Sequence, residues 1–308
     1  MEKEFDIYTQ DGKRLHMYKW DNANNIKGVV QLVHGSCEHA GRYEDICEFL
    51  NSRGYIVYAH DHRGHGKTED NIDDLGFFAE EKGWEKLIED LKLVNDRIHQ
   101  ENPGKQVIML GHSMGSFLAR HYAILYGTTI DALILSGTAH NPRLLLRLGL
   151  FAANLEIKRR GPKFRSQFIY KMSYDSFNKG FKPARTKCDW LSTDKKEVDK
   201  FLADERCGFV FTAAAFKDMF KGLLFITDHK NISKMRKNLP VLIISGKDDQ
   251  VGGRGKMVRK TCNVFTDVGI KDITLRLYEG MRHEIFNEIE KLKVFEDMLN
   301  WMDERIDD

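Results

Sequence analysis

The sequence predicts an α/β protein built on a mostly parallel β-sheet, and a repeated pattern of apolar runs carries that prediction. Each run is of strand length, rich in Val, Ile and Leu, and continuous rather than alternating, which is typical of strands buried on both faces. Helical segments separate the runs, and strands that alternate with helices favour a layered sheet. The runs cover residues 28–35, 55–61, 106–111, 131–137, 240–246 and 272–278.

The elements before and between these runs have their own local signals. At the N-terminus, two alternating segments flank Asp11-Gly12, a dipeptide typical of a tight hairpin turn. Residues 84–100 carry apolar side chains at spacings of three and four, which predicts an amphipathic helix. Asn102-Pro103-Gly104 is expected to end that helix.

One long interval breaks the rhythm of strand and helix. About a hundred residues between Gly137 and Pro240 contain no clear strand, whereas a loop between a strand and a helix usually has ~2–6 residues. We therefore expect a helical cap, inserted at 141–228, above a core formed by 1–140 and 229–308.

Composition and charge exclude several classes of protein. The 308 residues have a net charge of +2, so overall balance does not indicate a polyanion-binding protein. The five cysteines are odd in number and form no CxxC pair, which argues against a disulfide framework and a structural zinc site. We find no signal-peptide pattern and no apolar stretch of membrane-spanning length. These features predict a soluble protein of a reducing, cytoplasmic compartment.

The segment "LGHSMGS" contains a GxSxG pattern centred on Ser113, at the junction of an apolar strand and a helix. A sharp turn there strains the central residue, and small neighbours relieve the crowding. The hydroxyl of Ser113 is then exposed at the carboxyl edge of the sheet. The backbone N–H of Met114 lies at the helix N-terminus, where it can bind an oxyanion. Alone the pattern is weak, but its strand and helix context favours a nucleophile.

A serine nucleophile needs a base and an orienting acid, which follow it in the order acid, then histidine, in hydrolases of this kind. Asp248 and Asp249 come directly after the strand at 240–246, and His283 follows the strand at 272–278. Both positions lie where ligands collect in open α/β sheets. Position alone leaves both aspartates open as the acid, although Asp248 is more typical of a solvated turn carboxylate.

An earlier loop is expected to complete the oxyanion hole. It begins at His34-Gly35 and offers the backbone N–H of Ser36. From here the chain closely resembles the monoglyceride lipase and lysophospholipase family of serine hydrolases, which have the α/β-hydrolase fold. The segments that carry the resemblance are "VHGSCEHAGRYED", "YAHDHRGHGKTE", "LGHSMGS", "SGKDDQVGG" and "YEGMRHEIFNE".

The resemblance implies an eight-stranded sheet with a helical cap, and nucleophile Ser113, acid Asp249 and base His283. It prefers Asp249 because the family places its acid three residues after the glycine that ends the strand. Oxyanion binding by the N–H groups of Ser36 and Met114 is implied as well. Where the family often has Pro after the acid, this chain has Gln250.

In members that cleave monoglycerides, an acid and an arginine in the "EHxGRY" stretch hold the glycerol hydroxyls, and these match Glu38 and Arg42. The implied reaction is hydrolysis of monoacylglycerol to glycerol and a fatty acid. A lysophospholipase or a general carboxylesterase would use the same machinery, and an acyl-lipid binding protein on the same scaffold is the alternative that is not an enzyme.

No cofactor or metal is expected. The histidines of "HDHRGHGKT" (60–68) do not match a helical HExxH pattern, and "GKT" lacks the upstream glycine of a phosphate-binding loop. Residues 143–187 contain twelve Lys or Arg and only two acids, interleaved with Leu and Phe. That stripe suits either a solvated cationic face or peripheral contact with an anionic membrane or micelle. Nucleic acid is disfavoured because no recognised binding fold accompanies the charge.

Overall fold

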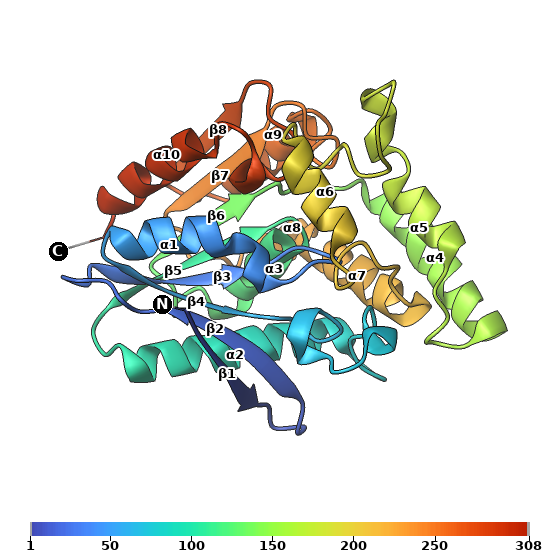
Figure 1. Cartoon of the computed structure of the whole chain (residues 1–308), viewed down its shortest axis with the longest axis horizontal. Coiled ribbons are helices and arrows are strands. Elements are labelled where there is room, and N and C mark those ends of the chain that lie inside the picture. The colour runs from blue at the N-terminus through green and yellow to red at the C-terminus, as the bar shows by residue number, and fades with distance from the viewer. Residues whose placement is uncertain (1, 307–308) are drawn as a thin grey trace.

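The computed structural model describes residues 2–306, which form one eight-stranded sheet with helices on both faces (Figure 1). The strand order is β1-β2-β4-β3-β5-β6-β7-β8. β2 pairs antiparallel with β1 and β4, and every other pairing is parallel, so the predicted fold class is confirmed. The strands are β1 (Glu2–Tyr8), β2 (Arg14–Trp20), β3 (Gly28–Val33), β4 (Tyr55–His60), β5 (Gln106–His112), β6 (Ala132–Ser136), β7 (Val241–Gly246) and β8 (Ile273–Tyr278).

The central strands are buried and mostly apolar because a helical layer covers each face of the sheet. In β3, Val29 and Val33 belong to the core under α2, α3 and α9, while Val30 and Leu32 belong to the core under α1 and α10. Consecutive side chains point to opposite faces of a strand, so two covered faces require a continuous apolar run. The covering helices are α1 (Glu44–Ser52), α2 (Gly83–Glu101), α3 (Met114–Tyr126), α9 (Lys256–Asp267) and α10 (Lys291–Asp303).

The long interval between β6 and β7 is helical, with one isolated bridge between Arg165 and Thr212. Two of its helices, α4 and α5, lie at the outer edge of the molecule (Figure 1). α7 connects them to the sheet, because it packs against α4 on one side and against α2 and α3 on the other. The helices are α4 (Arg143–Arg160), α5 (Gln167–Tyr174), α6 (Lys195–Ala203) and α7 (Ala213–Ile226), followed by the short α8 (His229–Ile232).

Glycines allow α7 to make these close contacts. At Gly222 a Cβ atom would lie 2.0 Å from the indole of Trp84 on α2, and at Gly149 on α4 it would lie 2.7 Å from Phe220. The 3₁₀ turns are η1 (Ala40–Tyr43), η2 (Gly66–Thr68), η3 (Ile72–Asp74), η4 (Phe177–Gly180) and η5 (Ile285–Asn287). Within residues 2–306, no helix combines the length and apolarity needed to cross a bilayer.

Candidate active site

Ser113 occupies a strained turn between β5 and α3. Its backbone has φ 50° and ψ −119°, a conformation rare for a residue other than glycine. The turn is held because the N–H of Ser113 donates to the carbonyl of Ser136 on β6 at 2.9 Å. Gly115 permits the close packing of α3, since a Cβ there would lie 2.0 Å from the carbonyl oxygen of Val33. The strain therefore presents the serine side chain at the carboxyl edge of the sheet.

The structure brings Asp249 and His283 together. The Asp249 Oδ2 atom lies 3.0 Å from His283 Nδ1, and both side chains are buried. Two donors orient the carboxylate, the Ser245 hydroxyl at 3.1 Å from Oδ2 and the Val251 N–H at 2.8 Å from Oδ1. Asp248, the alternative acid, is half-buried and makes no side-chain contact with the histidine among the described interactions. The geometry thus distinguishes the two carboxylates that position in the sequence left open.

Charges around this pair favour an ionisable base. Burial alone would favour the neutral imidazole of His283, but the Asp249 carboxylate, with Glu284 and Glu38 farther away, raises its pKa above the ordinary 6.5. Burial likewise opposes ionisation of Asp249, yet the facing imidazole and its donors keep the pKa of that carboxyl below 3.8. A neighbouring imidazole, His112, has its pKa lowered to about 3 by burial and by His283.

The loop after β3 brings Ser36 beside Ser113, and both line the same two cavities. Gly35 lies close to Ser113, since a Cβ at that position would lie 3.2 Å from Ser113 Cβ. Met114 begins α3 and is buried, so its N–H belongs to the first turn of that helix. The two backbone groups expected to bind an oxyanion therefore lie at one edge of the sheet, on either side of the serine.

Glu38 and Arg42 form a buried charge network with Glu284, the residue after the histidine. Arg42 donates to Glu38 at 2.5 Å and to both carboxylate oxygens of Glu284 at 2.8 and 2.7 Å. Glu38 also accepts the N–H of Gly35 and the hydroxyl of Tyr43, each at 2.6 Å. Burial and the nearby Glu284 raise the pKa of Glu38 despite Arg42, while Arg42 overcomes burial and lowers the pKa of Glu284 to about 2.

Two cavities of different character meet at Ser113. One, of about 570 Å³, is lined largely by apolar side chains of α4, α5, α7 and α3, including Leu148, Met172 and Phe220. The other is narrow, about 40 Å³, and its lining combines aromatic and aliphatic side chains with the carboxylates of Glu38 and Glu284. The two share four residues and are thus separated only by their side chains. The shared residues are Ser36, Ser113, Tyr174 and Trp190.

Of these expected site residues, Glu38 faces a cavity and Arg42 lies behind it. Glu38 lines the narrow cavity, while Arg42 lines neither cavity and stacks on the ring of Phe201 at 4.8 Å. The hydroxyl of Tyr174 on α5 donates to Ser36 Oγ at 3.2 Å. That bond ties the inserted helices to the loop that carries the expected oxyanion donor.

Hydrogen bonds that the sequence did not predict join the insertion to the loop that carries His283. The N–H of Glu284 donates to the Leu191 carbonyl at 2.7 Å, and Arg282 donates to the carbonyls of Asp189 and Ser192. The Trp190 ring lies 5.2 Å from the imidazole of His283. The segment after η4 therefore fixes the position of His283, and no local pattern shows such a contact between segments about ninety residues apart.

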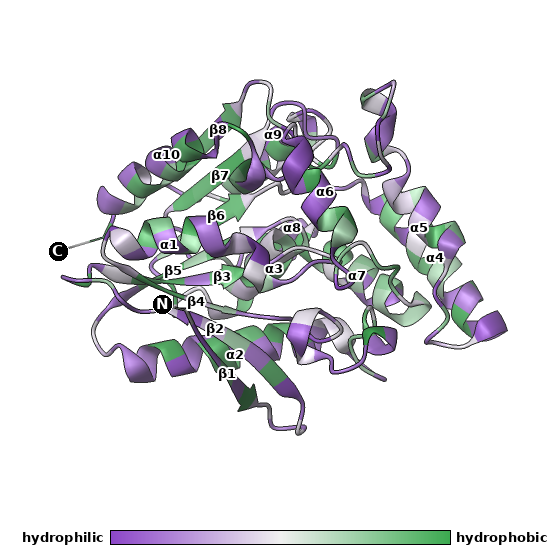
Figure 2. Ribbon diagram, in the orientation of Figure 1, coloured by the Kyte–Doolittle hydropathy of each residue, from purple (hydrophilic) through white to green (hydrophobic). Residues whose placement is uncertain are grey.

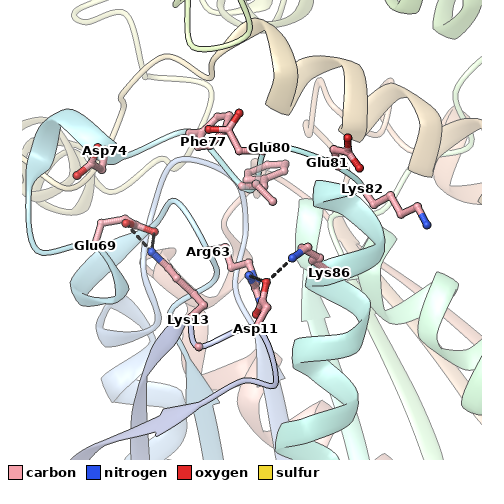
Figure 3. Close-up of a pocket in the computed structure, with 13 residues that line it drawn as sticks. Asp11, Lys13, Arg63, Glu69, Asp74, Phe77, Glu80, Glu81, Lys82 and Lys86 are labelled. Carbon is pink, nitrogen blue, oxygen red and sulfur yellow. Dashed lines mark hydrogen bonds and ion pairs between the residues drawn. The ribbon is translucent and has the colours of Figure 1, made fainter.

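A third cavity, of about 650 Å³, lies away from the serine, between the β1–β2 turn and the start of α2 (Figure 3). Five of its charged side chains pair with one another. Lys13 pairs with Glu69 at 2.6 Å, and Asp11 pairs with Arg63 at 2.8 Å and also with Lys86. This cavity contains neither Ser113 nor His283, so its volume does not make it the site of the serine chemistry.

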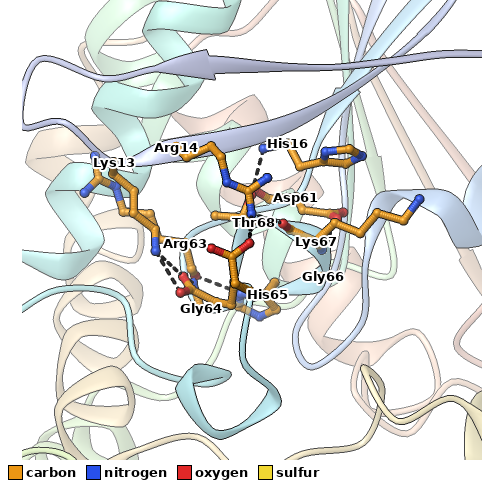
Figure 4. Close-up of polar contacts among 12 residues, drawn as sticks. Lys13, Arg14, His16, Asp61, Arg63, Gly64, His65, Gly66, Lys67 and Thr68 are labelled. Carbon is orange, nitrogen blue, oxygen red and sulfur yellow. Dashed lines mark hydrogen bonds and ion pairs between the residues drawn. The ribbon is translucent and has the colours of Figure 1, made fainter.

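The loop "HDHRGHGKT" is held together by hydrogen bonds within the fold (Figure 4). The buried Asp61 accepts the N–H of Lys67 at 2.6 Å and that of Ala40 at 2.8 Å. The Thr68 hydroxyl donates to the Asp61 carbonyl and accepts the N–H of His16. Gly66 is required there, since a Cβ would lie 2.1 Å from Asp61 Oδ2. The loop braces β2 against the segment that carries Glu38 and Arg42.

Comparison with known proteins places this geometry in context. A family model described as serine aminopeptidase, S33, matches residues 24–290. A monoacylglycerol lipase of Mycolicibacterium smegmatis is 26% identical, over 94% of this chain and 93% of the relative. Human monoglyceride lipase is 25% identical, over 97% of this chain and 90% of the relative. A thermostable carboxyl esterase from Bacillus coagulans, solved in complex with glycerol, superposes with a TM-score of 0.92 at 25% identity, covering 99% of each chain.

Proposed function

The chain belongs to the family described as serine aminopeptidase, S33, and from that premise we propose that its substrate is a monoacylglycerol, cleaved to glycerol and a fatty acid. It is a carboxylic ester hydrolase that acts on lipids. The observation that carries the choice of substrate is the meeting at Ser113 of a large, mainly apolar cavity and a narrow one into which the carboxylates of Glu38 and Glu284 project. An acyl chain suits the first and a small polyol suits the second.

In the proposed mechanism, Ser113 attacks the ester carbonyl while His283 takes the hydroxyl proton. Asp249 fixes the imidazole tautomer and stabilises the imidazolium that forms. The negative charge on the tetrahedral intermediate is bound by the N–H groups of Ser36 and Met114, and losing one such donor typically costs about 3 kcal/mol. His283 then protonates the departing alcohol, and water hydrolyses the acyl-enzyme by the same steps.

The glycerol group is proposed to lie in the narrow cavity. Glu38 lines it with a carboxylate that accepts hydroxyl protons, and Arg42 holds that carboxylate in place from behind. A lysophospholipase would have to admit a phosphate ester beside two carboxylates, which electrostatic repulsion disfavours. A general carboxylesterase remains the alternative, and only selectivity among alcohols distinguishes it.

Substitution tests both the chemistry and the selectivity. We expect Ser113→Ala to remain folded and to lose hydrolysis of monoacylglycerol and of p-nitrophenyl esters alike. We expect Glu38→Gln to lower kcat/KM for monoacylglycerol more than for a p-nitrophenyl ester of the same acyl chain. Wild-type turnover of esters by the alanine variant would exclude Ser113 as the nucleophile. An equal loss on both substrates would exclude a role of Glu38 in binding glycerol.

The outer face of α4 and α5 supports a further part of the proposal, peripheral contact with an anionic lipid surface. Leu144, Leu148 and Phe151 are 68%, 56% and 69% exposed. Hydrophobic and charged residues alternate along these helices (Figure 2). Leu148 and Met172 also line the apolar cavity, so its entrance lies on this face. Apolar side chains amid Lys and Arg suit a helix lying in a membrane interface.

A matched pair of variants tests the membrane contact. Phe151→Glu places a charge on the proposed docking face, whereas Leu292→Glu places one on α10, where the leucine is 62% exposed. We expect the first variant to sediment less with anionic vesicles and the second to behave as wild type. Equal binding of wild type to neutral and anionic vesicles would exclude the electrostatic part.

The proposed location is a reducing, cytoplasmic compartment. The five cysteines are all unpaired, which is typical of proteins in such a compartment.

A further inference from the structure

Three side chains with metal-binding atoms meet where the insertion contacts the core. His39 lies in the loop after β3, next to Glu38, while Asp204 and Cys207 follow the end of α6. One nitrogen of His39, one oxygen of Asp204 and the sulfur of Cys207 lie within 4.8 Å of one another. The mechanism proposed above uses none of these three residues. Among residues 2–306, these three form the group of possible metal ligands whose donor atoms lie this close together.

Local hydrogen bonds already orient the donor atoms. The Arg206 N–H donates to Asp204 Oδ1 at 2.8 Å, which leaves Oδ2 facing His39 Nε2, also at 2.8 Å. The N–H of Cys207 donates to the Asp204 carbonyl at 3.0 Å, so both residues lie on a single turn. Gly208, at φ 66°, then donates to the carbonyl of Cys37 at 2.9 Å and fixes that turn against the loop after β3.

Thiolate, imidazole and carboxylate are all ligand types that zinc binds. Asp204 and Cys207 are separated by two residues on one turn, which is the spacing of the two cysteines in a CxxC zinc-binding turn, and His39 supplies a third ligand from a distant segment. Zinc binds sulfur at about 2.3 Å and nitrogen or oxygen at about 2.0–2.2 Å, so a tetrahedral ion holds its ligand atoms roughly 3–4 Å apart. The nitrogen of His39 and the oxygen of Asp204 lie 2.8 Å apart and the sulfur lies within 4.8 Å of both, so small side-chain movements bring the three atoms to that geometry.

We propose that His39, Asp204 and Cys207 bind a divalent zinc ion that joins α6 of the insertion to the loop after β3, with water as the fourth ligand. His39 and Asp204 retain 18% and 35% side-chain exposure, so the site opens to solvent for an entering ion and its water. The ligand set of one thiolate and one carboxylate balances the charge of the ion. The proposal concerns these residues alone and does not depend on the substrate proposed above.

Binding of the ion releases one proton, that of the Cys207 thiol. The Cys207 thiol loses its proton to solvent as the zinc–sulfur bond forms, His39 binds as the neutral imidazole, and no electrons are transferred. Because the thiol must lose its proton to bind the ion, zinc affinity rises with pH. The charged groups that face the sulfur are Arg42, Asp204, Glu38 and Glu284.

The ion would stabilise the contact between α6 and the loop after β3. The loop it holds also carries Ser36 and Glu38, and Cys37 within it accepts the hydrogen bond from Gly208. Since the ion binds only when α6 and the loop are assembled, it stabilises the native state by mass action. At a zinc concentration about a hundredfold above Kd, we expect Tm to rise by roughly 5 °C.

Cobalt reports the site directly, because a cobalt–thiolate bond absorbs light and zinc displaces cobalt without absorbing. We expect the wild-type protein to develop the thiolate charge-transfer band at pH 8 and to lose it on addition of zinc. Cys207→Ser should show no band and His39→Gln a band that needs far more cobalt to form. Cys262→Ser, which removes a half-buried thiol on α9, is the matched control and should behave as wild type.

Melting temperatures without metal show that each variant is folded before titration. The proposal is overturned if wild type gives no thiolate band and no zinc-dependent rise in Tm, which would leave His39 and Asp204 as an ordinary hydrogen-bonded pair. It is also overturned if Cys207→Ser keeps the band, or if Cys262→Ser loses it, because the ion would then lie elsewhere.

Discussion

Arg42→Met provides the sharpest test of the buried charge network beside the site. The methionine keeps much of the aliphatic volume and removes the only cation between two buried carboxylates, Glu38 and Glu284, among the residues described. Removing one partner of a buried ion pair leaves an uncompensated charge and typically costs 3–5 kcal/mol. We therefore expect a large loss of stability from a substitution that creates only a small cavity.

The size of the loss follows from the pKa of Glu284. Arg42 overcomes the effect of burial and holds that pKa at about 2 rather than 4.5, which corresponds to about 3 kcal/mol favouring the ionised carboxylate. A group whose pKa is lowered in the folded state contributes stability above its unfolded pKa and loses it as pH falls through the folded value. The difference in unfolding free energy between wild type and Arg42→Met should thus be fully present at pH 7 and should decrease below about pH 4.5.

Thermal unfolding followed by circular dichroism at pH 7 and pH 4 measures this difference. We expect Arg42→Met to lower Tm by roughly 6 °C at pH 7 and by less at pH 4. Arg185→Met is the matched control, because Arg185 pairs with Asp199 at the surface, where the two side chains are 40% and 57% exposed. Exposed pairs contribute about 0–1 kcal/mol. Equal effects of the two substitutions at pH 7 would refute the argument.

Three further outcomes are expected. The acid limb of kcat/KM against pH, measured with a p-nitrophenyl ester, should have its midpoint above 6.5, because the pKa of His283 is shifted in that direction. Asp249→Asn should move this midpoint to lower pH and lower kcat roughly 10⁴-fold. Gly115→Ala, which brings a Cβ to 2.0 Å from a carbonyl oxygen of β3, should abolish labelling by an active-site probe and lower Tm. Gly222→Ala should cost about 1–3 kcal/mol in chemical denaturation, because its methyl overlaps the indole of Trp84, whereas an unchanged midpoint would mean that α7 readily shifts away.

The strands could be predicted because burial on both faces of the sheet leaves a recognisable pattern in the sequence. The run at 240–246 is mostly apolar since helices cover both faces, and β7 occupies Val241–Gly246. The start of the last helix was less predictable. His283 follows β8, but α10 begins only at Lys291, and a 3₁₀ turn lies between the histidine and the helix. Glu284 and Glu288 in that connection bind groups of the insertion and of the loop after β3, which favours an irregular backbone over a longer helix.

The candidate site also contains residues that could be predicted from the sequence and contacts that could not. Ser113, Asp249 and His283 each follow a recognisable strand, so the order of the strands along the sheet brings them to one edge. The role of Glu284, the hydrogen bonds from the loop of His283 to residues 189–192 and the cluster at His39 depend on contacts between segments far apart in the chain. No local spacing or periodicity reports such contacts, and only the packing of the insertion on the core creates them.

Labelling with a fluorophosphonate, followed by digestion and mass spectrometry, tests the central claim most directly. Trypsin releases residues 106–120, a peptide with two serines, Ser113 at the strained turn and the buried Ser116. The account predicts one adduct, on Ser113, and none in the Ser113→Ala protein. An adduct on another residue, or equal labelling of the alanine variant, would contradict it.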